Sequence, residues 1–233
     1  MSVTATDTAV LCGVYPGVAR RRYGASSLNN HFNHETAVRL LTGAIARSAA
    51  QLDIGVEPAA AHSTRHYVRV YVRVRVGASK ADAALASIGH VSWCPACGHA
   101  AGSDEPAVTC EGCGRRAKVA GPLWLGPMTE GKLVAQAAKM ARSRRLSAAS
   151  EVISSLAGLD DFPPWCFSIE GICSSLKVST VPEGGVYRHL VSAGHRAMRT
   201  PFEKTGVKTD ADYAEVRDAV RAAASEGAPR SLA

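Results

Sequence analysis

Strict alternation of side chains marks the clearest element in the first third of the chain. Over residues 66–76 every second position is valine, and the positions between the valines carry tyrosine or arginine. A period of two places successive side chains on opposite faces of a β-strand, so the pattern predicts a strand with a buried valine face. We expect Arg69, Arg73 and Arg75 on the other face to pair with carboxylates, because late strands of doubly wound sheets are covered on both faces. If that face is exposed instead, it becomes a further candidate binding surface.

The N-terminal segment predicts a strand that belongs to a larger sheet. Residues 2–12 are rich in β-branched and apolar side chains, which favours a buried strand running into a loop. This strand begins almost at the initiator methionine, with no earlier element to pair with. We therefore expect a larger domain that has been cut or that another chain completes. Pro16 and Gly17 then open a loop that holds residues 20–24.

Apolar residues at helical spacing predict a helix over residues 33–52. Asn33 is the expected N-cap of this helix, because its side chain can accept a hydrogen bond from the first turn. Residues 54–61 predict a short strand. The order strand, helix, strand, strand matches the last part of a doubly wound sheet that ends in an antiparallel hairpin.

The remainder of the chain predicts short elements and then a change of character at about residue 160. Before that point we expect a helix at 80–87, strand segments at 117–120 and 123–125, and helices at 129–143 and 147–156. After it we expect helices at 168–177 and 180–193, a strand at 195–200 and a last helix at 210–224. Thr180 and Glu183 have capping-box spacing, and Gly194 suits the position after a helix end. Helix, short turn, helix, strand is a winged-helix-like order.

Two cysteine pairs carry the most specific chemical signal. Cys94 and Cys97 form one C-x2-C pair, and Cys110 and Cys113 form the second after 12 intervening residues. This spacing is typical of a zinc ribbon, in which each tight turn aims two thiolates at one Zn²⁺. Four thiolates leave no open coordination position, so we expect a structural metal. The alternative for these residues is two disulfides or free core thiols.

Composition narrows the kind of partner and compartment. The chain has 27 Lys and Arg against 20 Asp and Glu, and its net charge of +7 favours an anionic partner, with nucleic acid first. We see no signal peptide and no apolar run long enough to span a membrane. The cysteine spacing suits a reducing compartment, so we expect a cytoplasmic protein. Cys12, Cys166 and Cys173 have apolar neighbours and are expected to be core thiols.

Three basic clusters are the candidate nucleic-acid contacts. Arg and Lys neutralise phosphates, and an exposed Tyr can stack on a splayed base. The alternative for each residue is a solvated surface charge. The candidates are Arg20, Arg21, Arg22 and Tyr23 in the first cluster, Lys139, Arg142, Arg144 and Arg145 in the second, and Arg188, His195, Arg196, Arg199, Lys204 and Lys208 in the third.

Several sequence blocks occur in the order found in one family. They are TATDTAVLCG from Thr4, RRYGA from Arg21, Glu35-x-x-x-Arg39-Leu-Leu, HYVRVYVRV from His66, GPLWLGP from Gly121, and GHRAMRTPF from Gly194 followed by GVKTDA from Gly206. Each block is short, but the ordered set spans most of the chain. It resembles the tRNA (guanine-26 N2)-dimethyltransferase family.

This resemblance implies a class I methyltransferase that uses S-adenosylmethionine to methylate the exocyclic N2 of a guanine between the D and anticodon stems of tRNA. It also implies an RNA-binding domain after the methyltransferase sheet. The chain matches only the second part of that layout, since no glycine-rich cofactor loop follows a strand and no Asp-Pro-Phe-Gly loop is present. We therefore assign no catalytic residue. Asp7 either borders the cofactor pocket or is structural, and the segment from Phe162 to Trp165 is interpreted as packing.

The predicted fold class is α/β. We expect the C-terminal half of a Rossmann-like class I methyltransferase sheet at 1–78, a connector with a four-cysteine zinc ribbon at 79–128, an α+β winged-helix-like tRNA-binding domain at 129–226, and a frayed tail at 227–233. The predicted function is the tRNA-binding portion of a tRNA guanine-26 N2-methyltransferase that is inactive alone. Its expected partners are tRNA, structural zinc and a separate chain carrying the S-adenosylmethionine-binding half. The alternative is a zinc-ribbon and winged-helix DNA-binding regulator without catalytic activity.

Overall fold

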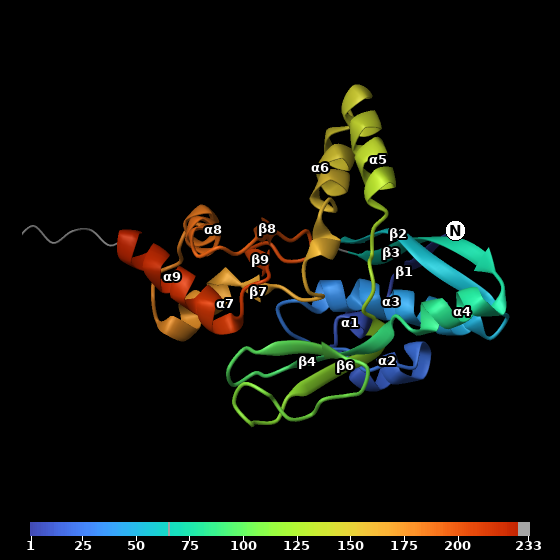
Figure 1. Ribbon diagram of the computed structural model, residues 1–233, viewed down its shortest axis with the longest axis horizontal. Helices are drawn as coiled ribbons and strands as arrows, with labels where there is room; N and C mark the ends of the chain where they lie inside the picture. Colours follow the sequence, from blue (N-terminus) through green and yellow to red (C-terminus); the bar gives the residue numbers. More distant parts are fainter. Residues whose placement is uncertain (65, 228–233) are drawn as a thin grey trace, which may run out of the picture.

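A three-stranded sheet forms the first β layer of the molecule (Figure 1). The computed structural model describes residues 1–64 and 66–227. The strands β1 (Ser2–Ala5), β2 (Ile54–Thr64) and β3 (Tyr67–Val76) pair in the order β1-β3-β2. Both neighbours run antiparallel to β3, so β1 and β2 are parallel to each other, as predicted for the end of a doubly wound sheet. Within the described ranges, the outer edge of β1 pairs with no other strand.

The first predicted strand is only partly right. β1 is followed by a short helix, α1 (Thr8–Leu11), because the N–H groups of Val10 and Leu11 both bond the Asp7 carbonyl, at 2.9 and 3.2 Å. This turn buries Val10 and Leu11, which an extended segment at the sheet edge would expose. The prediction of one strand over 2–12 is therefore wrong in its second half, and β1 alternates between exposed and half-buried residues instead of being buried.

The next two helices differ from prediction at their starts. α2 (Pro16–Tyr23) stands where we predicted a loop, because a proline at the first helical position already has a helical φ. Gly24, with φ 59°, ends this helix in the left-handed conformation. α3 (Asn33–Ala50) confirms the predicted helix, but Phe32 is its N-cap residue. Asn33 already belongs to the first turn, so its predicted capping role is wrong.

The second β layer is an antiparallel ribbon. After α4 (Ala78–Leu85), the strands β4 (Ile88–Trp93), β5 (Ala100–Ser103) and β6 (Lys118–Trp124) pair in the order β5-β4-β6. The two strand segments predicted at 117–120 and 123–125 are one continuous strand, β6. The first cysteine pair follows β4, and the second lies between β5 and β6.

α3 lies between these two layers and is the centre of the fold (Figure 1). Every α3 residue from Glu35 to Gly43 is buried. On the sheet side the helix packs against the valine face of β3, although the last two valines of that strand are exposed. On the ribbon side a Cβ at Gly43 would lie 3.1 Å from the Cα of Leu123, so any larger residue would require β6 to move away by a few tenths of an ångström.

A pair of helices projects from the body of the molecule (Figure 1). α5 (Gly131–Ser143) and α6 (Ser147–Ser155) confirm the predicted helices and pack against each other as a hairpin. Buried residues of α5 include Val134, Ala138 and Ala141, whereas no α6 residue is fully buried. A 3-10 turn, η1 (Leu159–Asp161), then leads toward the C-terminal region.

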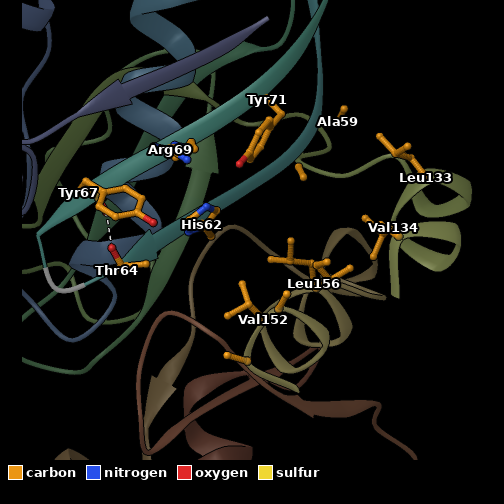
Figure 2. A pocket seen from close by; sticks show the side chains of 15 residues that line it. Ala59, His62, Thr64, Tyr67, Arg69, Tyr71, Leu133, Val134, Val152 and Leu156 are labelled. Carbon is orange, nitrogen blue, oxygen red and sulfur yellow. Dashed lines mark hydrogen bonds between the residues drawn. The ribbon is translucent and has the colours of Figure 1, made fainter. Parts of the chain in front are cut away.

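An apolar groove separates this helical hairpin from the sheet, with a volume of about 590 Å³ (Figure 2). The sheet contributes His62, Tyr67 and Tyr71, and the two tyrosine ring centroids lie 5.6 and 6.2 Å from that of His62. The helices contribute Leu133 and Val152, which are 38 and 41% exposed. Among residues 1–64 and 66–227, the face of β3 that points away from α3 is therefore left open.

The C-terminal region packs helices around a small antiparallel sheet. Its elements are β7 (Phe167–Ser168), α7 (Ile169–Leu176), α8 (Glu183–Ser192), β8 (Ala197–Arg199), β9 (Gly206–Thr209) and α9 (Tyr213–Gly227), with strand order β7-β9-β8. The predicted order of helix, turn, helix and strand is confirmed. β9 was not predicted as a strand, and it pairs with β8 to form a hairpin, which we call the wing.

Helix α8 starts later than predicted. It begins at Glu183 with Pro182 as its N-cap residue, and no side chain caps it. The predicted capping box between Thr180 and Glu183 is therefore wrong, because Thr180 lies outside the N-cap position. Gly194 has φ 93° directly after the helix end, as predicted.

Two apolar clusters make up most of the core. One joins α3, both β layers and the base of the helical hairpin, and the other lies within residues 167–223. Trp165 packs against both clusters, so the segment from Phe162 to Trp165 serves packing, as predicted. In the part of the chain that the structure describes, no helix has the length and apolar character needed to cross a bilayer. The predicted frayed tail lies outside the described residues, apart from Gly227 at the end of α9.

Candidate metal centre and nucleic-acid interface

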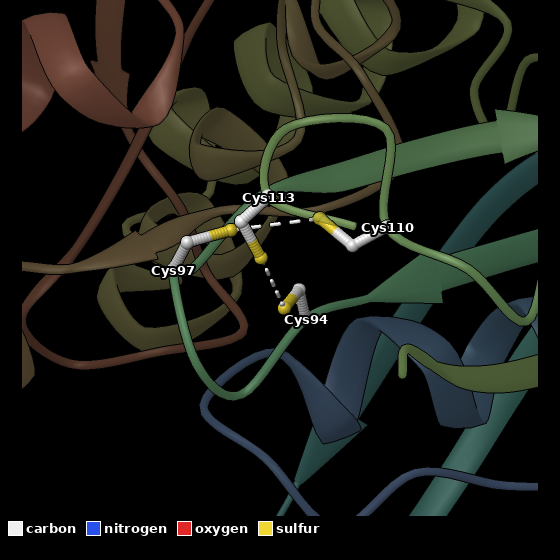
Figure 3. Close-up of side chains that lie close together, drawn as sticks. All are labelled: Cys94, Cys97, Cys110 and Cys113. Carbon is white, nitrogen blue, oxygen red and sulfur yellow. Dashed lines mark hydrogen bonds between the residues drawn. The ribbon is translucent and has the colours of Figure 1, made fainter. Parts of the chain in front are cut away.

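The four paired cysteines meet in one cluster (Figure 3). Their Sγ atoms all lie within 4.8 Å of one another, with 3.6 Å between Cys94 and Cys113 and 3.5 Å between Cys97 and Cys110. Zn–S bonds of about 2.3 Å in a tetrahedron require S···S distances of about 3.8 Å, close to these values. A disulfide requires about 2.05 Å, so the two-disulfide alternative is wrong, and all seven cysteines are free. The donor set fits one tetrahedral metal ion.

The backbone of both cysteine turns supports this arrangement. The N–H groups of Gly98 and Gly114 each bond the carbonyl of the first cysteine in their pair at 2.8 Å. Both glycines have positive φ, 78° and 69°, a conformation that glycine adopts without steric cost. Burial raises the pKa of the Cys94 thiol, but hydrogen bonds from the N–H groups of Cys97 and Ala96 and from the Cys113 and Cys97 side chains together bring that pKa to about 7, whereas burial raises the pKa of Cys97 to about 12. A lower pKa favours the thiolate, which is the form that binds metal.

The other three cysteines are core thiols, as predicted. Cys12, Cys166 and Cys173 are all buried. Burial raises the pKa of Cys12 to about 11 and raises the pKa of Cys166 well above its ordinary value. The Cys12 and Cys166 thiols are therefore protonated at neutral pH and are poor nucleophiles.

The first basic cluster lies on α2 and is partly engaged within the chain. Arg20 and Arg21 are exposed. Arg22 forms an ion pair with Asp7 at 3.0 Å, and the Tyr23 hydroxyl donates a hydrogen bond to the same carboxylate. Burial and this bond raise the pKa of Tyr23. Asp7 thus anchors α2 to the segment after β1, which favours the structural interpretation of Asp7.

The second basic cluster occupies the far end of the helical hairpin. Lys139 and Arg142 lie in the last turns of α5, and Arg144 and Arg145 form the turn to α6. All four side chains are exposed. In the described residues, their one side-chain hydrogen bond joins Arg142 to the Ser154 hydroxyl at 3.5 Å. The fold therefore concentrates four cations on one projecting tip.

The third basic cluster surrounds α8 and the wing. Arg188, Arg196 and Arg199 are exposed and pair with carboxylates at N···O distances of 3.5, 3.0 and 3.8 Å. His195 is half-buried between two carboxylates at 3.1 and 3.5 Å. Lys204 is exposed on the loop between β8 and β9. Exposed ion pairs contribute little to stability, so these arginines remain available to phosphate.

Lys208 does not belong to this surface. Its side chain is fully buried, and its Nζ donates to the Glu35 carboxylate at 2.9 Å and to the carbonyls of Pro163 and Trp165 at 2.6 and 3.2 Å. Burial lowers the pKa of Lys208, while the Glu35 carboxylate raises it. The prediction of Lys208 as an RNA contact is wrong, because it lies on β9, a strand whose four residues are all buried.

Glu35 is the centre of a buried ionic network that the sequence analysis missed. It also accepts two hydrogen bonds from Arg39, both at 3.2 Å, and Arg39 donates to the carbonyls of Trp124 and Gly126 at 3.2 and 3.1 Å. The network joins α3 to the end of the ribbon and, through Lys208, to the C-terminal region. An acid and a base four residues apart among apolar helix positions were the available signal.

The polar face of β3 agrees with only half of its prediction. Arg73 pairs with Glu130 at 2.7 Å and Arg75 pairs with Glu57 at 3.2 Å, so two of the three arginines have the predicted carboxylate partner, whereas Arg69 donates to the Thr4 hydroxyl at 2.8 Å. The Arg73 and Arg75 side chains are nevertheless 48 and 50% exposed. The expectation that this face is covered is wrong in the described residues, and the face remains open.

Comparison with known proteins places these features in a family context. A family model described as N2,N2-dimethylguanosine tRNA methyltransferase matches residues 1–221. Two curated relatives, both named tRNA (guanine(26)-N(2))-dimethyltransferase, come from Methanothermobacter thermautotrophicus and Methanosarcina acetivorans. They are 35 and 37% identical to this chain over 224 and 229 residues, which is 94 and 95% of this chain and 59% of each relative.

A solved structure is similar over the same extent. It is Trm1 from Pyrococcus horikoshii in complex with S-adenosyl-L-methionine, with a TM-score of 0.83 and 32% sequence identity. The match covers 94% of this chain and 58% of that chain. This chain therefore spans about three fifths of the length of the proteins that it resembles.

Proposed function

This chain belongs to the N2,N2-dimethylguanosine tRNA methyltransferase family, and on that premise we propose that it is the tRNA-binding C-terminal portion of a tRNA guanine-26 N2-methyltransferase. The observation that carries this proposal is the family match over residues 1–221 in a sequence without a glycine-rich cofactor loop or an Asp-Pro-Phe-Gly loop. The methyl donor of the reaction is S-adenosylmethionine. The chain itself supplies substrate binding and no catalytic side chain.

The proposed tRNA surface consists of the exposed cations on α2, the tip of the helical hairpin, and the wing. These groups lie on three separate parts of the fold, which suits recognition of tRNA by shape through distributed phosphate contacts. Lys208 is left out of the proposed contacts because it is buried. The remaining proposed contacts are Arg20, Arg21, Arg22, Tyr23, Lys139, Arg142, Arg144, Arg145, Arg188, His195, Arg196, Arg199 and Lys204.

We propose that Cys94, Cys97, Cys110 and Cys113 hold one structural Zn²⁺. Their S···S distances support this assignment, and four thiolates leave no position for substrate. When bound, the metal fixes the two turns of the ribbon and takes no part in methyl transfer. A site of this kind persists in a reducing compartment, so we place the chain in the cytoplasm.

The S-adenosylmethionine-binding half of the family enzyme is proposed to lie in polypeptide outside residues 1–233. Two features support a completing segment: the unpaired edge of β1 in the described structure and the open apolar groove beside β3. A longer product of the same gene or a separate chain can supply it. Mass spectrometry of the native protein and its associated chains distinguishes these two sources.

We propose domain boundaries at 1–78, 79–128 and 129–226. The two apolar clusters support a division in general, because most of the C-terminal cluster is confined to residues 167–223. The first cluster, however, extends from the sheet across the ribbon to Val134 and Leu156 of the helical hairpin, so the first two parts share one core with the hairpin that begins the third. Limited proteolysis with mass mapping of the stable fragments tests these boundaries.

The decisive experiment measures RNA binding and cofactor binding separately. In a competition shift assay, labelled tRNA should be displaced by unlabelled tRNA at much lower concentration than by duplex DNA. Calorimetry should detect no binding of S-adenosylmethionine to residues 1–233. Preference for duplex DNA would support the alternative, a zinc-ribbon and winged-helix regulator. Tight cofactor binding would contradict the assignment of the cofactor site to another polypeptide segment.

A further inference from the structure

A second cavity lies where the wing approaches the sheet, and we call it the wing cleft. It has a volume of about 590 Å³ and is lined by residues 62–64 at the end of β2, by one side of α6, and by residues 198–204 of the wing. A smaller hollow of about 210 Å³ continues from it to His34 at the start of α3. A volume of roughly 300–1,000 Å³ is typical of sites for small organic ligands, a class that includes single nucleotides.

The wing cleft lies at an edge of the sheet where ligands commonly bind. β1 and β2 are parallel, so their carboxyl ends, at Ala5 and Thr64, lie at the same edge of the sheet. In open α/β sheets, ligands bind in the crevice outside the carboxyl ends of the parallel strands. The wing brings the C-terminal region to this edge, beside the base of α6 (Figure 1). The cleft is therefore shared between the sheet and the proposed RNA-binding region.

The walls of the cleft suit an aromatic base. Val152 and Leu156 from the α6 segment line one part, and Met198 and Phe202 from the wing line another. Val152 is 41% exposed, so an apolar surface is offered to solvent there. Phe202 and Leu156 are buried in the first apolar cluster and form a fixed floor. A base inserted between the exposed Val152 and the half-buried Met198 would replace water on the apolar surface of both walls.

The rim of the cleft suits a ribose and a phosphate. Arg199 and Lys204 are exposed cations at its mouth, and in the described residues Lys204 has no carboxylate within ion-pair distance. Glu151 and Glu203 also line the cleft, and their oxygens can accept from a 2′-hydroxyl or from base N–H groups. The mixture of two cations and two acids fits a nucleotide better than it fits an isolated anion.

The cleft is also preorganised. The Phe202 N–H bonds the Thr200 hydroxyl at 3.2 Å, and the Arg199 guanidinium donates to the Lys204 carbonyl at 3.3 Å, so the loop of the wing is held by its own bonds. On the opposite wall, His34 and the Ser63 hydroxyl form a hydrogen bond at 3.2 Å. A site that is ordered before binding loses less conformational entropy when the ligand enters.

We propose that the wing cleft holds one unpaired nucleotide of the RNA substrate, with its base between the α6 and wing walls and its phosphate at Arg199 and Lys204. The inference rests on the proposed function and adds to it a specific pocket for a splayed base. It also separates two roles within the basic surface. Most cations contact backbone phosphates and so recognise the shape of the RNA, whereas the wing binds one extruded nucleotide.

The experiment combines cleft filling with crosslinking on the full chain. Ser155→Trp fills the cleft at a position that does not line the groove beside β3, and Ala83→Trp fills another cavity of about 310 Å³, lined by Ala83 of α4, as the matched control. Ser155→Trp should weaken tRNA binding about tenfold, the order expected for loss of one stacked base. Ala83→Trp should leave the affinity unchanged. A tRNA transcript with 4-thiouridine at its unpaired positions should crosslink to peptides containing 198–204 or 147–156, and Ser155→Trp should abolish those crosslinks.

A second variant protects the test against a folding defect. Lys204→Ala removes an exposed cation at the cleft, and Lys118→Ala removes an exposed lysine of the ribbon as its control. Only Lys204→Ala should reduce the wing crosslinks. If the wild-type chain binds tRNA but both pairs of variants behave alike and the crosslinks map elsewhere, the wing cleft is not the nucleotide site and the proposed function stands. If the wild-type chain does not bind tRNA, the proposed function itself is contradicted, whatever the variants show.

Discussion

The two β layers that cover α3 differ in how much apolar surface and strand edge they leave exposed. On the ribbon side, β6 approaches the helix backbone closely at Gly43, and Leu123 is fully buried in the contact. On the sheet side, the cover consists of three strands, and in the described part of the chain β1 has a free edge. Beyond β3, the groove leaves Leu133 and Tyr71 partly exposed.

This difference teaches that regular secondary structure alone does not mark the end of a folding unit. Both layers consist of three strands joined by antiparallel pairing and both bury apolar residues against α3, yet among the described residues only the sheet side leaves an apolar groove on its outer face, whereas the ribbon ends in the four-cysteine cluster. The sheet side keeps apolar surface in contact with water, which is unfavourable unless another polypeptide covers it. Stability measurements on matched substitutions should separate the two sides.

The largest effect should come from the metal site. Cys110→Ser removes one of four thiolates, and structural zinc binding contributes on the order of 10 kcal/mol to folding. We expect zinc content, measured by elemental mass spectrometry, to fall from one ion per chain to near zero, with loss of the cooperative thermal transition of the ribbon. The control is Cys173→Ala, a buried thiol outside the cluster, which should keep its zinc. Full zinc occupancy in Cys110→Ser would contradict the assignment.

The next largest effect should come from the buried ionic network. Glu35→Ala leaves Lys208 and Arg39 without their carboxylate, and removal of one partner from a buried pair costs about 3–5 kcal/mol. Urea denaturation followed by circular dichroism measures this change. Adding Lys208→Met to Glu35→Ala should recover part of the loss, because the uncompensated ammonium is then gone. Glu151→Ala, at an exposed acid, should have almost no effect. Strictly additive single and double substitutions would show that the two residues are not coupled.

A matched pair of leucines tests the comparison directly. Leu123→Ala, on the closed side, should cost about 2–5 kcal/mol, because it opens a cavity in a packed core. Leu133→Ala, on the open side, should cost less than about 1 kcal/mol, because that side chain is 38% exposed already. The free energies of unfolding come from urea titrations of the two variants. Equal losses would mean that the groove is already covered in solution.

The smallest effect should come from the exposed face of β3. Arg73→Ala removes the ion pair with Glu130, whose partners are both more than one third exposed. Solvent screens such a pair, so the thermal midpoint should barely change, and any change should shrink further at an ionic strength of about 0.5 M. A large, salt-insensitive loss of stability would show that this face is covered by another chain.

Local patterns in the sequence were sufficient for much of the fold. The alternating valines of β3 and the apolar spacing of α3 each follow from one element's own periodicity, and both were predicted. The cysteine cluster was predicted for a similar reason, because short C-x2-C turns constrain their own geometry. These features depend little on where distant segments pack.

Features that depend on distant contacts were missed. β9 has four residues and no clear alternation, so only its pairing with β7 and β8 identifies it as a strand. The burial of Lys208 follows from that pairing and from Glu35, 173 residues away along the chain. The wing cleft is likewise formed by segments far apart along the chain, residues 62–64 and 198–204, so no local sequence motif predicts it.

The burial of Lys208 gives the protein an internal chemical reporter. Amine-reactive reagents modify lysines that solvent can reach, so the Lys208 side chain, with no exposed surface, is protected while α3 and β9 remain together. Its rate of acylation, followed by peptide mass spectrometry, would therefore measure how often the C-terminal region separates from the rest of the molecule. The same burial shields this lysine from enzymatic acetylation for as long as the native contact persists.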